Sequence, residues 1–289
     1  MSARLRVRYP FPQAHDGRPG RTGGGSDLIS LWTIDRSDDP IVATAIHDGH
    51  VLRDDVSAIH ALSETERLRE EDPFTGRWTA VAPTRIVPLR SRFEVDLNRP
   101  RERAVYLRPG DAWDLSLWKQ DPPADLIASS LAEYDAFYSM LGEVLSHLVG
   151  LFGRVVVLDL HTYNHRRQGP DRPAADPEAN PEVNVGTGSM DRELFRPVVD
   201  RFIGDLRGSG VRRKRPDVRE NVKFLGGHMS RWIHRSFPGT VCALAVEFKK
   251  VFMDEWSGVV DEKAHREIAG ALAETIPGLR EEIRGLARR

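Results

Sequence analysis

Two histidines stand directly after apolar runs, where they could ligate a metal. His47 follows IVATAI and His161 follows VVVLDL. Neutral imidazoles suit Zn²⁺, which in a catalytic site takes three protein ligands and keeps one position open for water. His50 follows His47 by three residues, a spacing that lets two side chains of a tight turn reach one ion, and Asp48 between them is a weaker alternative. The sequence therefore predicts a zinc site of His47, His161 and one further ligand.

The segments that carry these residues alternate between strand and helix patterns. Strand patterns lie in residues 41–50, 84–100, 154–161 and 240–252. Helix patterns lie in residues 126–152, in 192–207, from about Asp261 onward, and after a capping box of Ser63 with Glu66. The alternation predicts a single α/β domain with a mostly parallel or mixed central sheet flanked by helices. In such sheets ligands bind beyond the carboxyl ends of the strands, so the polar strand ends should meet at one rim.

Composition gives no argument for a nucleic-acid or membrane partner and leaves small polar or anionic metabolites open as ligands. The 289 residues carry 42 Lys and Arg against 43 Asp and Glu, so the overall charge would attract neither nucleic acid nor a membrane surface.

Residues 1–27 are rich in Gly, Pro and Arg and predict a loosely ordered arm before a domain at 28–289. The single cysteine, Cys242, excludes an internal disulfide, and no apolar run resembles a membrane span or a secretory signal. We therefore expect a cytoplasmic protein with no membrane partner.

Across about residues 40–256 the sequence resembles the N-formylglutamate amidohydrolase family, a relative of the zinc carboxypeptidases and of aspartoacylase. The resemblance rests on six segments in the family's order, which are HDGH at 47–50, EED at 70–72, RSRFEVDLNRP at 90–100, DLHTYNH at 159–165, GGHMSRWI at 226–233 and EFKKVFMDE at 247–255. It implies a zinc-carboxypeptidase-like catalytic domain that cleaves the amide bond of a small N-acyl amino acid, such as N-formylglutamate.

The resemblance also implies one Zn²⁺ per chain. His47 matches the first zinc ligand of the family and His161 the last. Carboxypeptidase-like sites have a glutamate three residues after the first histidine, where this chain has His50. Three imidazoles would leave the zinc more positive and its water more acidic. The substitutes for His50 that stay open are Asp48, Glu70, Glu71 and Asp72.

Substrate and proton-transfer roles follow from the same resemblance. Asn98 and Arg99 match a pair that binds a substrate carboxylate, and a planar guanidinium suits bidentate capture of such a group. Arg92 is either a second cationic contact or part of a structural salt bridge. Glu247 matches the general base, which takes a proton from water and delivers it to the leaving amine. His228 is a candidate contact to the substrate or the tetrahedral intermediate.

Three alternatives stay open. Glu247 could be an edge-strand acid paired with Lys249 or Lys250. The chain could also be a deacylase or a carboxypeptidase-like enzyme for another N-acyl amino acid or peptide. From a different class, it could be a metal-binding regulatory module without turnover.

Overall fold

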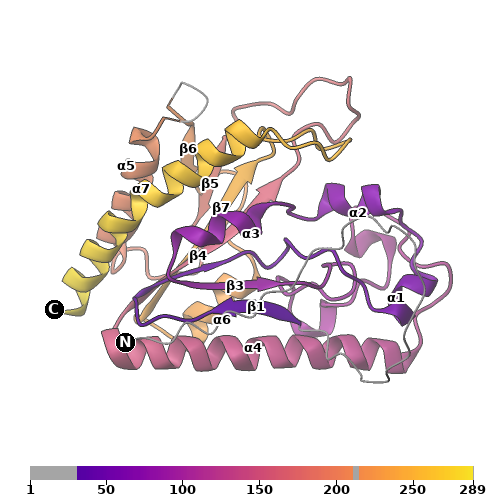
Figure 1. Ribbon diagram of the computed structural model, residues 1–289, viewed down its shortest axis with the longest axis horizontal. Helices are drawn as coiled ribbons and strands as arrows, with labels where there is room; N and C mark the ends of the chain where they lie inside the picture. The colour runs from indigo at the N-terminus through magenta and orange to yellow at the C-terminus, as the bar shows by residue number, and fades with distance from the viewer. Residues whose placement is uncertain (1–30, 211–214, 289) are drawn as a thin grey trace, which may run out of the picture.

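The central element of the structure is a mixed β-sheet with helices on both faces (Figure 1). A computed structural model describes residues 31–210 and 215–288, so the arm predicted at residues 1–27 lies outside the described residues. Within the described part, the strands are β1 (Trp32–Asp35), β2 (Ile41–Thr44), β3 (Thr84–Pro88), β4 (Val155–Tyr163), β5 (Val183–Gly186), β6 (Val218–Glu220) and β7 (Val241–Lys249). The α-helices are α1 (Asp54–Ile59), α2 (Glu64–Glu70), α3 (Thr75–Trp78), α4 (Ala124–Phe152), α5 (Arg196–Gly208), α6 (His228–Ser236) and α7 (Glu262–Ala287).

The strand order is β1-β3-β2-β4-β7-β5-β6. The four strands β3, β2, β4 and β7 run parallel, so their carboxyl ends meet at one edge of the sheet. β1 is antiparallel to β3, and β5 is antiparallel to β7. This arrangement confirms the prediction of an α/β domain with a mixed sheet.

The two faces of the sheet have separate apolar cores. In Figure 1, α4 runs along one side of the sheet, while α5 and α7 lie on the other. On β4, Leu158 packs in the core that contains residues of α5 and α7, whereas Val157 packs in the core that contains residues of α4 and α6. Successive side chains of a strand point to opposite faces, so Asp159 and His161 continue the α4 side. The same alternation on β7 directs Glu247 to that side.

Several elements agree with the sequence prediction. The helix expected at 126–152 is α4, the strand at 154–161 is β4, and α7 begins after Asp261, whose side chain caps it. The capping box of Ser63 and Glu66 is present at the start of α2. Local capping and periodicity signals therefore predicted the long elements well.

Two segments differ from the prediction. The strand expected at 84–100 ends at Pro88, and the rest of that segment is a loop. Its alternating pattern comes from Phe93, Val95 and Leu97, which are buried beneath the loop rather than along a strand. Residues 168–190 are rich in Pro, Gly and Asn, a composition that predicts a loop, yet they contain the short strand β5, which pairs with β7.

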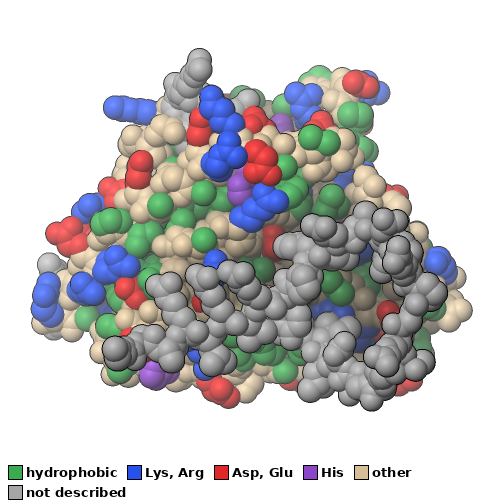
Figure 2. Space-filling model, in the orientation of Figure 1, with side chains coloured by type: hydrophobic (Ala, Val, Ile, Leu, Met, Phe, Trp, Pro, Cys, Tyr) green, Lys and Arg blue, Asp and Glu red, His purple; other side chains and the backbone are tan. Residues whose placement is uncertain are grey.

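The surface carries charges of both signs. On the face in Figure 2, Lys and Arg side chains lie among Asp and Glu side chains, as the nearly equal totals of 42 and 43 lead one to expect. Among the described helices, not one combines the length and apolar character needed to cross a bilayer.

Candidate metal centre and substrate cavity

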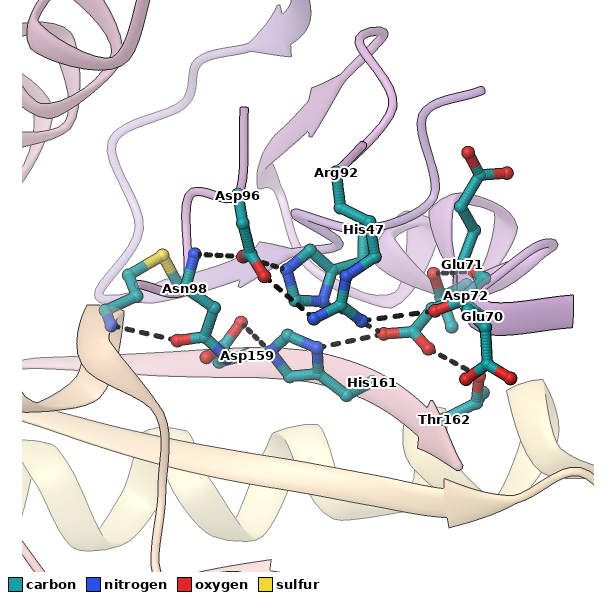
Figure 3. A network of polar contacts seen from close by, with 12 residues as sticks. His47, Glu70, Glu71, Asp72, Arg92, Asp96, Asn98, Asp159, His161 and Thr162 are labelled. Atoms are coloured by element: carbon teal, nitrogen blue, oxygen red, sulfur yellow. Dashed lines mark hydrogen bonds and ion pairs between the residues drawn. The ribbon is translucent and has the colours of Figure 1, made fainter. Parts of the chain in front are cut away.

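Three buried side chains at the carboxyl edge of the sheet could bind a metal ion together. His47, Asp72 and His161 each offer one ligand atom, and these atoms lie within 4.8 Å of one another. The Nδ1 atoms of His161 and His47 are 3.0 Å and 3.4 Å from Oδ2 of Asp72 (Figure 3). Two imidazoles and one carboxylate form a ligand set typical of catalytic zinc sites.

Three different elements position these ligands. His47 follows the end of β2, and His161 lies within β4, the neighbouring parallel strand. Asp72 follows α2, whose start is fixed by the Ser63 capping box. The Asp72 N–H donates to the His47 carbonyl at 2.9 Å, which joins the two segments directly.

A second carboxylate lies against the other nitrogen of each imidazole. Nε2 of His47 is 2.7 Å from Oδ1 of Asp96, and Nε2 of His161 is 2.9 Å from Oδ1 of Asp159. A carboxylate only accepts, so these contacts favour a proton on each Nε2 and direct each Nδ1 toward Asp72, the side on which a shared metal ion would bind. Among the described residues, none accepts or donates a hydrogen bond at the buried Nδ1 of His47. The donor set therefore fits a divalent metal ion.

The charges of the cluster also suit a cation. Burial alone would raise the pKa of Asp72, but the hydrogen bond from His161 and the charges of His161 and His47 hold that pKa well below its usual range. Burial disfavours protonation of His161, yet the Asp159 and Asp72 carboxylates raise its pKa well above the ordinary value. A metal ion and a proton compete for the same ring nitrogen. The carboxylates that favour protonated His161 would therefore also favour a metal cation bound there.

The structure does not bring His50 into this cluster. Its Nδ1 contacts the Glu71 carboxylate, its Nε2 lies 3.4 Å from Glu64, and its side chain is about one-third exposed. Gly49 packs tightly against the Leu89–Arg90 backbone, where an added Cβ would lie 2.3 Å from a carbonyl oxygen. The chain therefore passes close to that segment at Gly49, and His50 faces α2 instead of His47.

The other open substitutes are also separate from the cluster. Asp48 accepts a hydrogen bond from the Gly76 N–H at 2.9 Å, and burial raises its pKa to about 6. Glu70 accepts two hydrogen bonds from Arg167, at 2.8 and 3.2 Å. Of the acids left open by the sequence, the structure places Asp72 beside both histidines.

A cavity of about 350 Å³ opens beside the cluster. His47, Arg99, His161 and Glu247 all line it. The four residues therefore meet at one rim of the sheet as predicted, although Arg99 lies in the loop after β3 and not at a strand end. The volume lies within the range of small-molecule sites.

Glu247 is the neighbour of His161 across the β4–β7 ladder. Burial raises the pKa of Glu247 to about 8, although the His161 charge opposes that rise. A divalent cation in the neighbouring cluster would oppose it further, because a nearby positive charge favours the carboxylate. A carboxyl group at the cavity wall suits proton transfer when its pKa lies near neutral pH.

Lys250 has a structural contact that excludes the pairing with Glu247 considered from the sequence. Its buried ammonium group donates to the Arg69 carbonyl at 2.6 Å and to the Glu71 carbonyl at 2.7 Å. These carbonyls belong to the turn that carries Asp72. Lys250 therefore stabilises the position of a candidate ligand.

Asp96 connects the metal cluster to the basic side of the cavity. It is fully buried and accepts from Arg92 Nη2 at 2.9 Å, from the Asn98 N–H at 2.7 Å and from the Tyr106 hydroxyl. Burial would raise its pKa, but the Arg92 and His47 charges hold the pKa well below the usual range. Asp96 thus fixes one side chain of the cluster and the loop that carries the candidate substrate residues.

Arg99 keeps donors free for a ligand. Its Nη2 donates to the Asp111 carbonyl at 3.3 Å, and its Nε is 3.9 Å from Asp96. The side chain is 35% exposed and lines the cavity. Arg92, by contrast, is bound to Asp96 and to the Glu70 carbonyl, so it forms part of the cavity wall.

Asn98 lines the cavity and also binds the first turn of α6. Its Oδ1 accepts from the Met229 N–H at 3.0 Å. Gly227 must be glycine here, because an added Cβ would lie 2.1 Å from Oδ1 of Asn98. The side-chain amide NH₂ of Asn98 has no acceptor among the described residues, so it can donate to a ligand.

His228 lies outside this cavity. It is the first residue of α6 and borders a neighbouring cavity of about 800 Å³. Its ring packs near Tyr134 and Tyr138, with centroid distances of 6.5 and 5.8 Å. The structure therefore places His228 beside a neighbouring cavity, and its contact with the substrate or the tetrahedral intermediate stays a prediction.

Sequence reasoning assigned no cavity role to Asp96, Lys223 or Lys250, whereas Trp113 was a candidate for covering a pocket or for shielding the core. Trp113 has a left-handed backbone, with φ of 52°, and lies beneath the guanidinium groups of Arg92 and Arg167. Lys223 lies at the cavity wall, three residues before the GG pair. Of the unassigned residues, only Asp96 could have been identified from the sequence, because it lies four residues after Arg92 in the segment RSRFEVDLNRP.

Comparisons with known proteins agree with this architecture. The model of the N-formylglutamate amidohydrolase family matches residues 39–253. The chain therefore belongs to the N-formylglutamate amidohydrolase family, as the sequence resemblance predicted. Membership supports a hydrolase of the amidohydrolase class. No curated protein matches the sequence.

Two solved structures share the fold at low sequence identity. N-formylglutamate amidohydrolase from Ralstonia eutropha JMP134 matches with a TM-score of 0.69 and 17% identity, over 89% of this chain and 99% of its own. The gene product Atu2144 from Agrobacterium tumefaciens matches with a TM-score of 0.61 and 16% identity, over 88% of this chain and 96% of its own. A putative carboxypeptidase A from Shewanella denitrificans OS-217 has a TM-score of 0.41 and 10% identity, over 87% of this chain and 61% of its own.

Proposed function

We propose that this protein is a zinc-dependent amidohydrolase that cleaves small N-acyl amino acids of the N-formylglutamate type. The observation that carries the proposal is the meeting of the His47–Asp72–His161 cluster, Glu247 and Arg99 in one cavity. Family membership supports the amide-hydrolysing class. The products are a carboxylic acid and a free amino acid.

In this proposal, His47, Asp72 and His161 hold one zinc ion. When bound, zinc supplies a Lewis acid that polarises the amide carbonyl and makes water more acidic. Asp96 and Asp159 orient the two imidazoles through their Nε2 atoms. The ligand set thus replaces the three-histidine site predicted first from the sequence.

Arg99 and Asn98 bind the carboxylate of the substrate and present its amide bond to the cluster. Glu247 takes a proton from the attacking water and passes it to the leaving amine nitrogen. The new C–O bond and the broken C–N bond then leave a carboxylic acid and the amino acid. Glu247 lines the cavity and stands opposite His161 in the β4–β7 ladder, where a cation in the neighbouring cluster favours the carboxylate form that accepts the proton.

A panel of N-acyl amino acids, assayed for release of free amine, tests this function together with Arg99→Ala. We expect the parent protein to cleave substrates with a free α-carboxylate. We expect Arg99→Ala to raise KM by roughly 10- to 100-fold, since it removes charge-assisted hydrogen bonds, and to lose discrimination against α-carboxamides. Arg266→Ala, at an exposed position of α7, is the matched control.

Absence of amine release from every member of the panel would contradict the proposed function and would favour a metal-binding module. Unchanged preference for the carboxylate in Arg99→Ala would remove the assignment of Arg99 alone. Metal content and thermal melting must match the parent before either result is interpreted.

A further inference from the structure

Five basic side chains line the cavity, and three of them already have strong partners. Arg92 is bound to Asp96 at 2.9 Å, and Arg167 makes a two-pronged contact with Glu70. Lys250 donates to two backbone carbonyls. These three therefore contribute little uncompensated charge to a ligand. Arg99, assigned above to the substrate carboxylate, and Lys223 are the other two.

Lys223 lies on the cavity wall and is exposed to solvent. Among the described residues, its ammonium group has no carboxylate within 4.0 Å. Its Nζ lies 5.3 Å from the ring centroid of Tyr163 and 5.5 Å from that of Phe224. Partial burial, and then the charge of Arg167, lower its pKa below the usual value. An anion beside Lys223 would relieve both effects.

The backbone of Lys223 is fixed by a buried side chain. Oδ1 of Asn184 accepts from the N–H groups of Val222, Lys223 and Phe224 at 3.0, 2.8 and 3.3 Å. Its Nδ2 donates to the Phe224 carbonyl at 2.8 Å. Asn184 is fully buried on β5 and stands opposite Glu247 in the β5–β7 ladder. The position of Lys223 is thus tied to the strand that carries the proposed base.

We infer that Lys223 is a specificity-determining residue that binds a second carboxylate of the substrate. Arg99 follows β3 and Lys223 follows β6, so the two cations enter the cavity from segments distant in the sheet order. A substrate with two carboxylates can engage both while its amide bond lies near Glu247. This inference rests on the proposed function and narrows it to dianionic N-acyl amino acids.

The second carboxylate can belong to either half of the substrate. It can be the side chain of the amino acid, as in N-formyl-L-glutamate, or the end of a dicarboxylic acyl group, as in N-succinylglycine. Two substrate pairs separate these sources. N-formyl-L-glutamate is compared with N-formyl-L-glutamine, and N-succinylglycine is compared with N-butyrylglycine.

The test measures kcat/KM for both pairs with the zinc-loaded parent, Lys223→Met, Lys223→Arg and the control Lys263→Met on α7. Methionine keeps an apolar chain against the rings but removes the charge. We expect Lys223→Met to lower kcat/KM for one dianionic substrate by roughly 10- to 100-fold and to leave its monoanionic partner nearly unchanged. Lys223→Arg should restore most of the preference, and Lys263→Met should match the parent.

Binding of the same four compounds, measured by calorimetry, gives a readout that needs no turnover. Tighter binding of one dianion by the parent, lost in Lys223→Met, supports the inference even if no compound is cleaved, which would defeat the proposed function alone. The inference is overturned if the parent prefers neither dianion, or if the preference survives in Lys223→Met. An equal loss for both members of each pair also overturns it, because that would indicate a structural role.

Discussion

Glu247→Gln should lower turnover by roughly a hundredfold or more, while zinc content and substrate binding stay close to those of the parent. Glutamine has nearly the same shape but cannot take a proton from water at neutral pH. Glu247 lines the cavity beside His161 and contributes no ligand atom to the cluster, so the metal site should survive. Single-turnover rates, equilibrium binding and zinc content are the measurements.

The matched control is Glu274→Gln, at an exposed position of α7. This variant makes the same chemical change on a different element from Glu247, and the rate of amine release should stay unchanged. Full turnover by Glu247→Gln would remove the proposed base. Loss of zinc from the same variant would instead assign Glu247 to the metal site.

Asp72→Asn should weaken zinc binding by more than about a hundredfold and abolish hydrolysis at limiting zinc. The carboxylate is the only charged ligand of the proposed set, and loss of even an outer partner of a zinc ligand costs 10- to 100-fold in affinity. The measurement is zinc retained after dialysis against a calibrated chelator, together with the rate of amine release.

His50→Gln decides between the two ligand sets that the sequence allowed. His50 faces Glu71 and Glu64 in the structure, so its replacement should leave zinc affinity and rate within about threefold of the parent. If His50→Gln loses zinc while Asp72→Asn keeps it, the ligand set inferred from the structure is incorrect and the three-histidine site is restored.

The sequence predicted the parts of the fold that depend on local signals. β4 and α4 have long apolar patterns, and α2 has its capping box, so each could be recognised without knowledge of its neighbours. Strands of three or four residues, such as β5 and β6, have no such pattern. β5 forms because β7 offers it an edge, and β6 then pairs with β5, so both depend on the assembled sheet.

In the candidate site, too, some residues could be predicted from local sequence and others depend on the assembled fold. His47, His161 and Glu247 stand at or near strand ends, and the parallel sheet brings such positions to one edge. Asp72 could not be chosen from Glu70, Glu71 and Asp72, because the choice depends on where α2 ends relative to residues far away in the chain. The spacing of His47 and His50 is compatible with a shared ion, yet close packing at Gly49 directs the two side chains apart.

Titration of metal-stripped protein with Zn²⁺ tests the central claim most directly, with release of free amine from N-formyl-L-glutamate as the readout. The stripped protein should be inactive, and activity should rise linearly and level off at one zinc per chain. The same titration of a His47→Ala, His161→Ala double variant should show neither binding nor recovery. Full activity of the stripped parent, or stoichiometric zinc in the double variant, would contradict the proposed metal-dependent hydrolase.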